Sequence, residues 1–162
     1  VGWLVAGAAL LVSRSELELG RPDGDTSAAL APLLPVLTDP QGLGDRPRTI
    51  AAFAQSGPEL LYRTPHRTLA SPYHRNAAGL RDVHTLFTAR DDELALEVVR
   101  RRGIDLVLLC PDGPERVVHD IHEGDGSLHD RLCRGETPDW LSPVPLPPGA
   151  EAFRLYLVAL RR

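Results

Sequence analysis

Hydrophobic and polar positions divide the chain into an apolar start, a weakly patterned stretch and a longer region of alternating helix and strand patterns. Residues 3–12 are almost entirely apolar, and the run stops abruptly at Ser13 and Arg14. Residues 15–27 carry charges and turn formers, after which leucines recur at helical spacing, although prolines interrupt their regularity. We therefore expect a linker and one short helix over residues 15–47.

The pattern between residues 48 and 110 predicts alternating strands and helices. Short apolar stretches at 49–53 and 67–70 indicate strands, and a helix is expected after Ser56 because Pro58 suits a first helical turn. Further apolar residues recur at helical spacing from 80 to 87. The best-defined helix begins near Asp91 and ends at Gly103, after three arginines that complement its dipole.

The remaining elements predict a sheet that is covered by helices. Residues 104–110 form a nearly continuous apolar run, which is typical of a strand buried on both faces of a parallel sheet. A polar loop should follow, and Ser127 with Asp130 resembles a capping box before a short helix. Beyond a proline-rich turn at 143–148, residues 153–160 predict a closing strand that is antiparallel or at an edge. Together these elements predict an α/β fold, a small three-layer sandwich with a short, mostly parallel sheet, over residues 48–162.

The apolar start bears on cellular location. A helix needs roughly 20 apolar residues to cross a bilayer, so this run is too short to span one, and no basic leader precedes it as in a signal peptide. We interpret residues 1–14 as the end of a transmembrane helix that the start of the sequence cuts off. A buried helix or strand of a soluble domain is the alternative. Since the chain contains no Met, we expect it to be a piece of a longer protein.

Composition excludes several functions. The net charge is −4 and the basic residues form no stripe, so nucleic acid is not an expected partner. All 18 basic residues are Arg, a bias that is typical of GC-rich bacterial genomes. Glycine-rich nucleotide-binding motifs are absent, and we predict no cofactor. Cys110 and Cys133 allow one disulfide, although a pair of buried thiols is the favoured interpretation.

Two other places could carry chemistry. His119, His122 and His129 lie among acidic residues, but glycines at 124 and 126 break any helix that would hold them on one face. We interpret this stretch as a solvated loop and predict no metal site. Ser56 lacks the Gly-x-Ser-x-Gly setting of an exposed nucleophile, so we expect it to cap a helix, and we assign no catalytic residue.

The densest group of polar and aromatic side chains lies between residues 57 and 76. It follows predicted strands, and α/β folds place ligand sites at the carboxyl edge of the sheet. Asn76 also suits a helix cap, and a tyrosine and an arginine can serve structural roles. We predict that this segment binds substrate through Glu59, Tyr62, Arg63, His66, Tyr73, His74, Arg75 and Asn76.

The order of these elements resembles the soluble domain of GT-C membrane glycosyltransferases, whose best-known member is the catalytic subunit of oligosaccharyltransferase. The resemblance covers about two thirds of the chain, and it is carried by the strand, the glycine turn, the His-Arg-Thr-Leu-Ala segment and the helix before Arg-Arg-Gly-Ile-Asp-Leu-Val-Leu-Leu. The motifs Gly-Pro-Glu-Leu-Leu-Tyr-Arg-Thr-Pro-His and Pro-Tyr-His-Arg-Asn are similar to those of uncharacterised bacterial inner-membrane proteins. Where the transferase has Trp-Trp-Asp-Tyr-Gly, residues 52–57 retain only the final glycine, so sequon recognition is not implied.

The resemblance implies an extracytoplasmic C-terminal domain of a multi-spanning protein of the bacterial inner membrane, facing the periplasm. Catalytic acids and metal ligands of the GT-C family lie in membrane loops, so this domain would position a sugar or lipid-linked substrate. Its implied partners are its own membrane domain and a polyprenyl-phosphate-linked sugar. A structural or assembly module with no ligand of its own is the alternative.

Overall fold

The computed structural model describes residues 29–113 and 115–160, so the predicted membrane segment lies outside the described residues. Five strands are present in this part of the chain: β1 (Thr49–Ala51), β2 (Arg67–Thr68), β3 (Leu106–Leu109), β4 (Leu141–Val144) and β5 (Arg154–Val158). The α-helices are α2 (Leu34–Thr38), α3 (Gly57–Arg63), α4 (Ala77–Thr88), α5 (Asp92–Arg102), α6 (Glu115–Val118) and α7 (Leu128–Cys133). Short 3₁₀ turns occupy η2 (Ala31–Leu33), η3 (Leu43–Asp45), η4 (Ala54–Ser56) and η5 (His74–Asn76).

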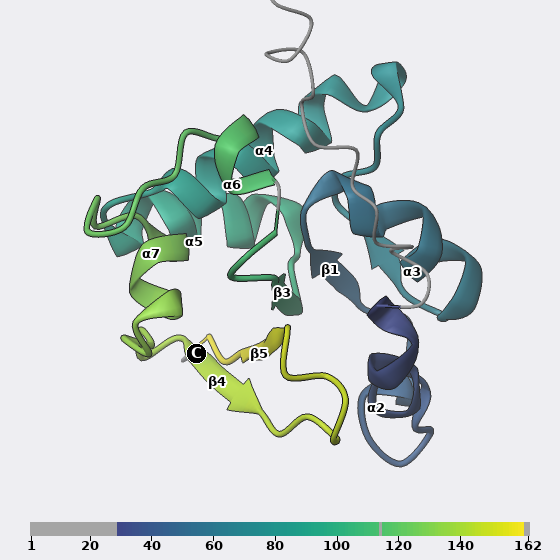
Figure 1. Cartoon of the computed structure of the whole chain (residues 1–162). Helices are drawn as coiled ribbons and strands as arrows, with labels where there is room; N and C mark the ends of the chain where they lie inside the picture. Colours follow the sequence, from purple (N-terminus) through teal and green to yellow (C-terminus); the bar gives the residue numbers. More distant parts are fainter. Residues whose placement is uncertain (1–28, 114, 161–162) are drawn as a thin grey trace, which may run out of the picture.

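The strands form one sheet in the order β2-β1-β3-β5-β4. The first three strands are parallel, and β5 and β4 extend the sheet as an antiparallel pair. Helices α4, α5 and α7 cover one face, while α2 and α3 lie at the other (Figure 1). The predicted α/β sandwich is therefore confirmed, and the closing strand is antiparallel as expected.

Two hydrophobic clusters flank the sheet, and β3 contributes to both. Val107 and Leu109 pack with α4, α5 and α7, whereas Leu106 and Leu108 pack with α2 and α3. Side chains alternate between the faces of a strand, so a strand with two covered faces is apolar at every position. This explains the continuous apolar run that predicted β3.

The ends of α5 and α7 follow the predicted capping signals. The Asp91 carboxylate accepts a hydrogen bond from the Leu94 amide at 2.8 Å, and Gly103 ends α5 in the left-handed region at φ 59°. Ser127 accepts a hydrogen bond from the Asp130 amide at 3.2 Å and so begins α7. Local sequence signals of this kind fix where the two helices begin.

Three regions differ from the sequence expectation. The first two residues of the proline-rich turn, Pro143 and Val144, belong to β4. The strand tolerates Pro143 because it lies at the sheet edge and pairs with β5 alone. The expected polar loop contains α6. In the described part of the stretch predicted as linker and short helix, residues 29–47, the chain forms η2, α2 and η3. Leu30, Leu33 and Leu37 there are fully buried in the second cluster. Tertiary packing supports these elements more than their local patterns do.

Candidate functional site

The eight predicted substrate-binding residues lie on α3, at the start of β2 and around η5. Tyr62 and Tyr73 are strongly exposed, at 86% and 59% of their surface, and Arg75 is also exposed. Glu59 and Arg63 form an ion pair across one turn of α3. The segment therefore brings aromatic and charged groups to the surface, while two of its members, His66 and Asn76, bind backbone groups.

His66 is buried and holds two distant segments together. Its Nδ1 accepts a hydrogen bond from the Arg48 amide at 3.2 Å, so the ring proton is on Nε2, which donates to the Leu37 carbonyl at 2.8 Å. Burial lowers the pKa of His66, so the ring is neutral at pH 7. His66 thus ties α2 to the beginning of β1.

The chain between β2 and η5 passes very close to the starts of α3 and α4. A Cβ on Gly57 would lie 2.4 Å from the Ala70 carbonyl oxygen, and one on Gly79 would lie 2.1 Å from that of Leu69. The Asn76 side chain donates to the same Leu69 carbonyl at 3.2 Å, although Asn76 occupies the N-cap position of α4. Both glycines are required by this close packing, which positions Tyr73 and Arg75 at the end of the segment.

A cavity of about 270 Å³, which we call the polar cleft, opens beyond the carboxyl end of β3. It is lined by Pro111, Asp112, Arg116, Ile121, His122, Glu123, His129, Asp130, Cys133, Arg134 and Arg154. The ring of His129 in this lining contacts Phe53, which follows β1, with the two ring centroids 5.6 Å apart. The cleft therefore lies at the sheet edge where open α/β folds bind ligands.

Asp130 and Arg154 build the frame of the polar cleft. The Asp130 carboxylate is 3% exposed and accepts hydrogen bonds from the Gly124 and Gly126 amides at 2.9 and 3.1 Å, with Arg134 at 3.2 Å. Arg154 donates to the carbonyls of Leu132 and, at 2.7 Å, of Cys133 at the end of α7. Both charges are thus satisfied by the protein itself.

His129 is the least expected member of the cleft. It is 1% exposed, its Nδ1 lies 3.5 Å from the Cys133 sulfur, and its Nε2 has no hydrogen-bond partner among the described residues. Burial, reinforced by the nearby Arg116 charge, lowers the pKa of His129 to about 4. The imidazole is therefore neutral at pH 7, in contrast to the solvated position expected from the sequence.

A histidine pair lies next to the cleft. The Nδ1 atoms of His84 and His119 are 2.9 Å apart, and the His119 ring stacks on Phe53. Burial and the neighbouring His84 lower the pKa of His119. Within residues 29–113 and 115–160, no group of three or more His, Cys, Asp or Glu side chains is arranged to hold a metal.

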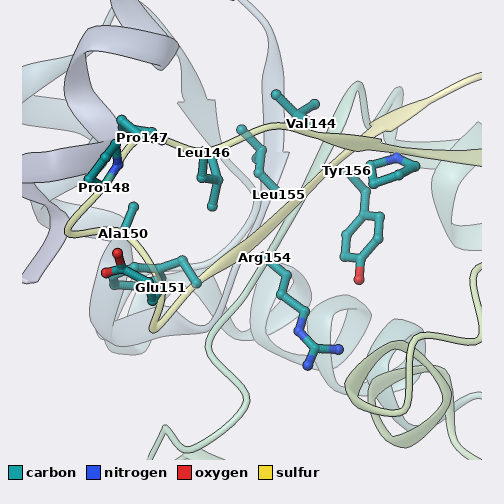
Figure 2. A pocket seen from close by; sticks show the side chains of 11 residues that line it. Val144, Leu146, Pro147, Pro148, Ala150, Glu151, Arg154, Leu155 and Tyr156 are labelled. Carbon is teal, nitrogen blue, oxygen red and sulfur yellow. The ribbon is translucent and has the colours of Figure 1, made fainter.

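A second cavity, of about 490 Å³, lies along the turn between β4 and β5. Figure 2 shows Leu146, Pro147 and Pro148 on its wall, while the Arg154 guanidinium points away from them. That guanidinium reaches α7 instead. The second cavity is thus mainly apolar, whereas the polar cleft gathers the charged groups.

Sequence reasoning missed most of the polar cleft. Five of the eleven lining residues lie in the histidine-rich stretch 119–130, for which the sequence predicts a solvated loop: Ile121, His122, Glu123, His129 and Asp130. The capping box at Ser127 was a usable signal, because it places the following residues on a helix next to the buried Leu128 and Leu132. No local signal connects them to Arg154, which is 25 positions after His129.

Cys110 and Cys133 are not joined in a disulfide. Of the helices that the structure describes, none has both the length and the apolar character to cross a membrane.

Comparison with known proteins identifies the fold. No protein-family model and no curated protein matches the chain. Among solved structures, the C-terminal globular domain of oligosaccharyltransferase from Archaeoglobus fulgidus is similar, with a TM-score of 0.62 and 12% sequence identity. The match covers 80% of this chain and 96% of that chain. The chain therefore has the α/β fold of this globular domain, and the resemblance stated from the sequence is confirmed at the level of the fold.

Proposed function

We propose that this chain is the C-terminal domain of a multi-spanning membrane protein related to GT-C glycosyltransferases. In this proposal the domain faces the periplasm of a bacterium and positions a sugar or lipid-linked substrate for a catalytic centre in the membrane part. The observation that carries the proposal is the fold match, which extends over 96% of the oligosaccharyltransferase domain.

The surface around α3 and η5 supports a positioning role. Tyr62 and Tyr73 expose large aromatic rings that suit stacking against a sugar, because an aromatic ring is apolar on its face and tyrosine adds a hydroxyl. Arg75 supplies an exposed guanidinium group close to Tyr73 in the sequence, and a guanidinium can bind a phosphate through two parallel hydrogen bonds. His66 and the two glycines fix the backbone beneath this surface.

Binding by the 162-residue chain tests the surface. A ¹⁵N-labelled sample is titrated with a polyprenyl-phosphate-linked monosaccharide in detergent micelles, and empty micelles serve as the ligand control. We expect localised shifts at residues 59–63 and 71–76, and Tyr62→Ala should weaken binding by about three- to tenfold through loss of stacking. Leu94→Ala, which truncates an exposed side chain on α5, should change nothing. Equal shifts with empty micelles would favour the structural module instead.

Activity of the intact parent protein tests the function itself. We expect Arg75→Ala and Tyr73→Ala to reduce glycosyl transfer while membrane expression stays unchanged. Glycosyl transfer at the wild-type rate in both variants would contradict the assignment of this surface. A parent protein without membrane spans would contradict the whole proposal.

A further inference from the structure

We propose that the polar cleft is a binding site for a small sugar that carries an anionic group, phosphate or carboxylate, which is held by His129 and Arg116. The inference concerns a different part of the molecule from the α3 and η5 surface, and it does not depend on the membrane glycosyltransferase assignment. It rests on unpartnered buried donors, on the charges around them and on the size of the cleft.

The first observation is the pairing of two unsatisfied groups. In the described part of the chain, four buried side-chain nitrogens have no hydrogen-bond partner, and two of them belong to His129 and Arg116, which line the same cavity. Leaving a buried polar group unpaired costs about 1–3 kcal/mol. Two residues that line one cavity and each leave a donor unpaired are what a site needs when its ligand completes the hydrogen bonds.

The second observation is the proton distribution on His129. Burial raises the pKa of the Cys133 thiol, so the thiol is protonated at pH 7 and can donate to His129 Nδ1. With Nδ1 accepting, the ring proton lies on Nε2, which is then a donor without a partner among the described residues. The Arg116 Nε–H is a donor as well, so the two unpaired groups together suit an oxyanion.

The charges around the cleft define the rest of the ligand. Asp130 is compensated by two amides and Arg134, and Arg154 is used by the carbonyls of α7, so neither is needed by a ligand. Arg116 then supplies the positive charge, while the exposed carboxylates of Asp112 and Glu123 line the cleft. These two carboxylates would repel a dianion such as free phosphate, which has no other groups to offer. They accept hydrogen bonds from the hydroxyl groups of a ligand. A ligand with both an anionic group and hydroxyl groups therefore suits the cleft, because Arg116 can bind the anionic group and the carboxylates can accept hydrogen bonds from the hydroxyl groups.

The volume sets the size of this ligand. About 270 Å³ lies just below the roughly 300–1,000 Å³ that is usual for drug-sized ligands. A single monosaccharide unit with one anionic group is of this class, whereas an oligosaccharide would extend outside the cleft.

The test uses the whole 162-residue chain and four probes: glucose 6-phosphate, glucuronate, inorganic phosphate and glucose. Calorimetry gives affinities, and ¹⁵N spectra of the histidine rings report on His129 directly. We expect binding of glucose 6-phosphate or glucuronate with a shift of His129 Nε2, weaker binding of inorganic phosphate, and at least tenfold weaker binding of neutral glucose. The difference between the first two probes tells phosphate from carboxylate recognition.

Two variants and one control complete the test. Arg116→Gln and His129→Phe should each weaken binding about tenfold or more, as expected when a hydrogen bond to a charged group is lost. His129→Phe keeps a ring of similar shape between Phe53 and Phe87, so it is expected to fold. Arg67→Gln makes the same charge change at an exposed residue of the edge strand β2, outside the cleft, and should bind like the original chain. Any one of three results would overturn the proposed site. Glucose could bind as tightly as glucose 6-phosphate and glucuronate, the His129 signal could stay unmoved, or both cleft variants could keep the wild-type affinity.

Discussion

Two buried histidines, His66 and His129, show how similar burial serves different purposes. Both are almost inaccessible, at 3% and 1% exposure, and burial lowers the pKa of each. Both ring nitrogens of His66 bind backbone groups, which makes the residue a structural link between α2 and β1. His129 is one of the residues that line the polar cleft, and it leaves Nε2 without a partner among the described residues. A satisfied histidine stabilises a fold, whereas an unsatisfied one is better explained by a ligand.

The largest expected effect is the loss of stability when His66 is replaced. His66→Phe leaves the Arg48 amide and the Leu37 carbonyl without their partners, so the free energy of unfolding should fall by about 3 kcal/mol. Urea unfolding followed by circular dichroism at pH 7.5 measures it. A loss below about 1 kcal/mol would mean that the two hydrogen bonds contribute little.

Acid should destabilise the chain through His129. The pKa of His129 is about 4 in the folded protein, against the ordinary histidine value of 6.5, so the unfolded chain binds the proton more tightly. Stability is then fully present above about pH 6.5 and falls as the pH drops toward 4, by up to about 3 kcal/mol. Urea unfolding from pH 7.5 to 4 measures this slope.

The control for the pH effect is His129→Phe, which cannot take up the proton. Its unfolding free energy should fall less steeply over the same interval, although other groups still titrate, His66 and His119 among them. Parallel curves for both proteins would contradict a strongly lowered pKa for His129.

The smallest expected effect is that of His129→Phe on stability at pH 7.5, and it distinguishes the two histidines most clearly. At pH 7.5, His129→Phe should change the free energy of unfolding by no more than about 1 kcal/mol, because Nε2 has no protein partner to lose and the contact with the Cys133 sulfur is weak. The same substitution should remove binding in the polar cleft. A stability loss as large as that of His66→Phe would make His129 a structural residue too.

How much could be predicted differs between elements. Helix α5 was predictable because Asp91 and Gly103 act on their own neighbours, and β3 was predictable because burial on both faces leaves it apolar throughout. Strand β4 was not predictable, because Pro143 is acceptable only at a sheet edge, and edge position is a property of the assembled sheet.

The candidate sites divide in the same way. The sequence by itself determined the α/β class, the principal helices and the polar character of residues 57–76, since these depend on periodicity, caps and local composition. Only the tertiary structure decided that His66 reaches back 29 positions to Leu37, and that residues 111–134 meet Arg154 around one cavity. Hydrogen bonds and cavities join side chains that are distant along the chain, and only packing of the sheet between its helices brings them within reach.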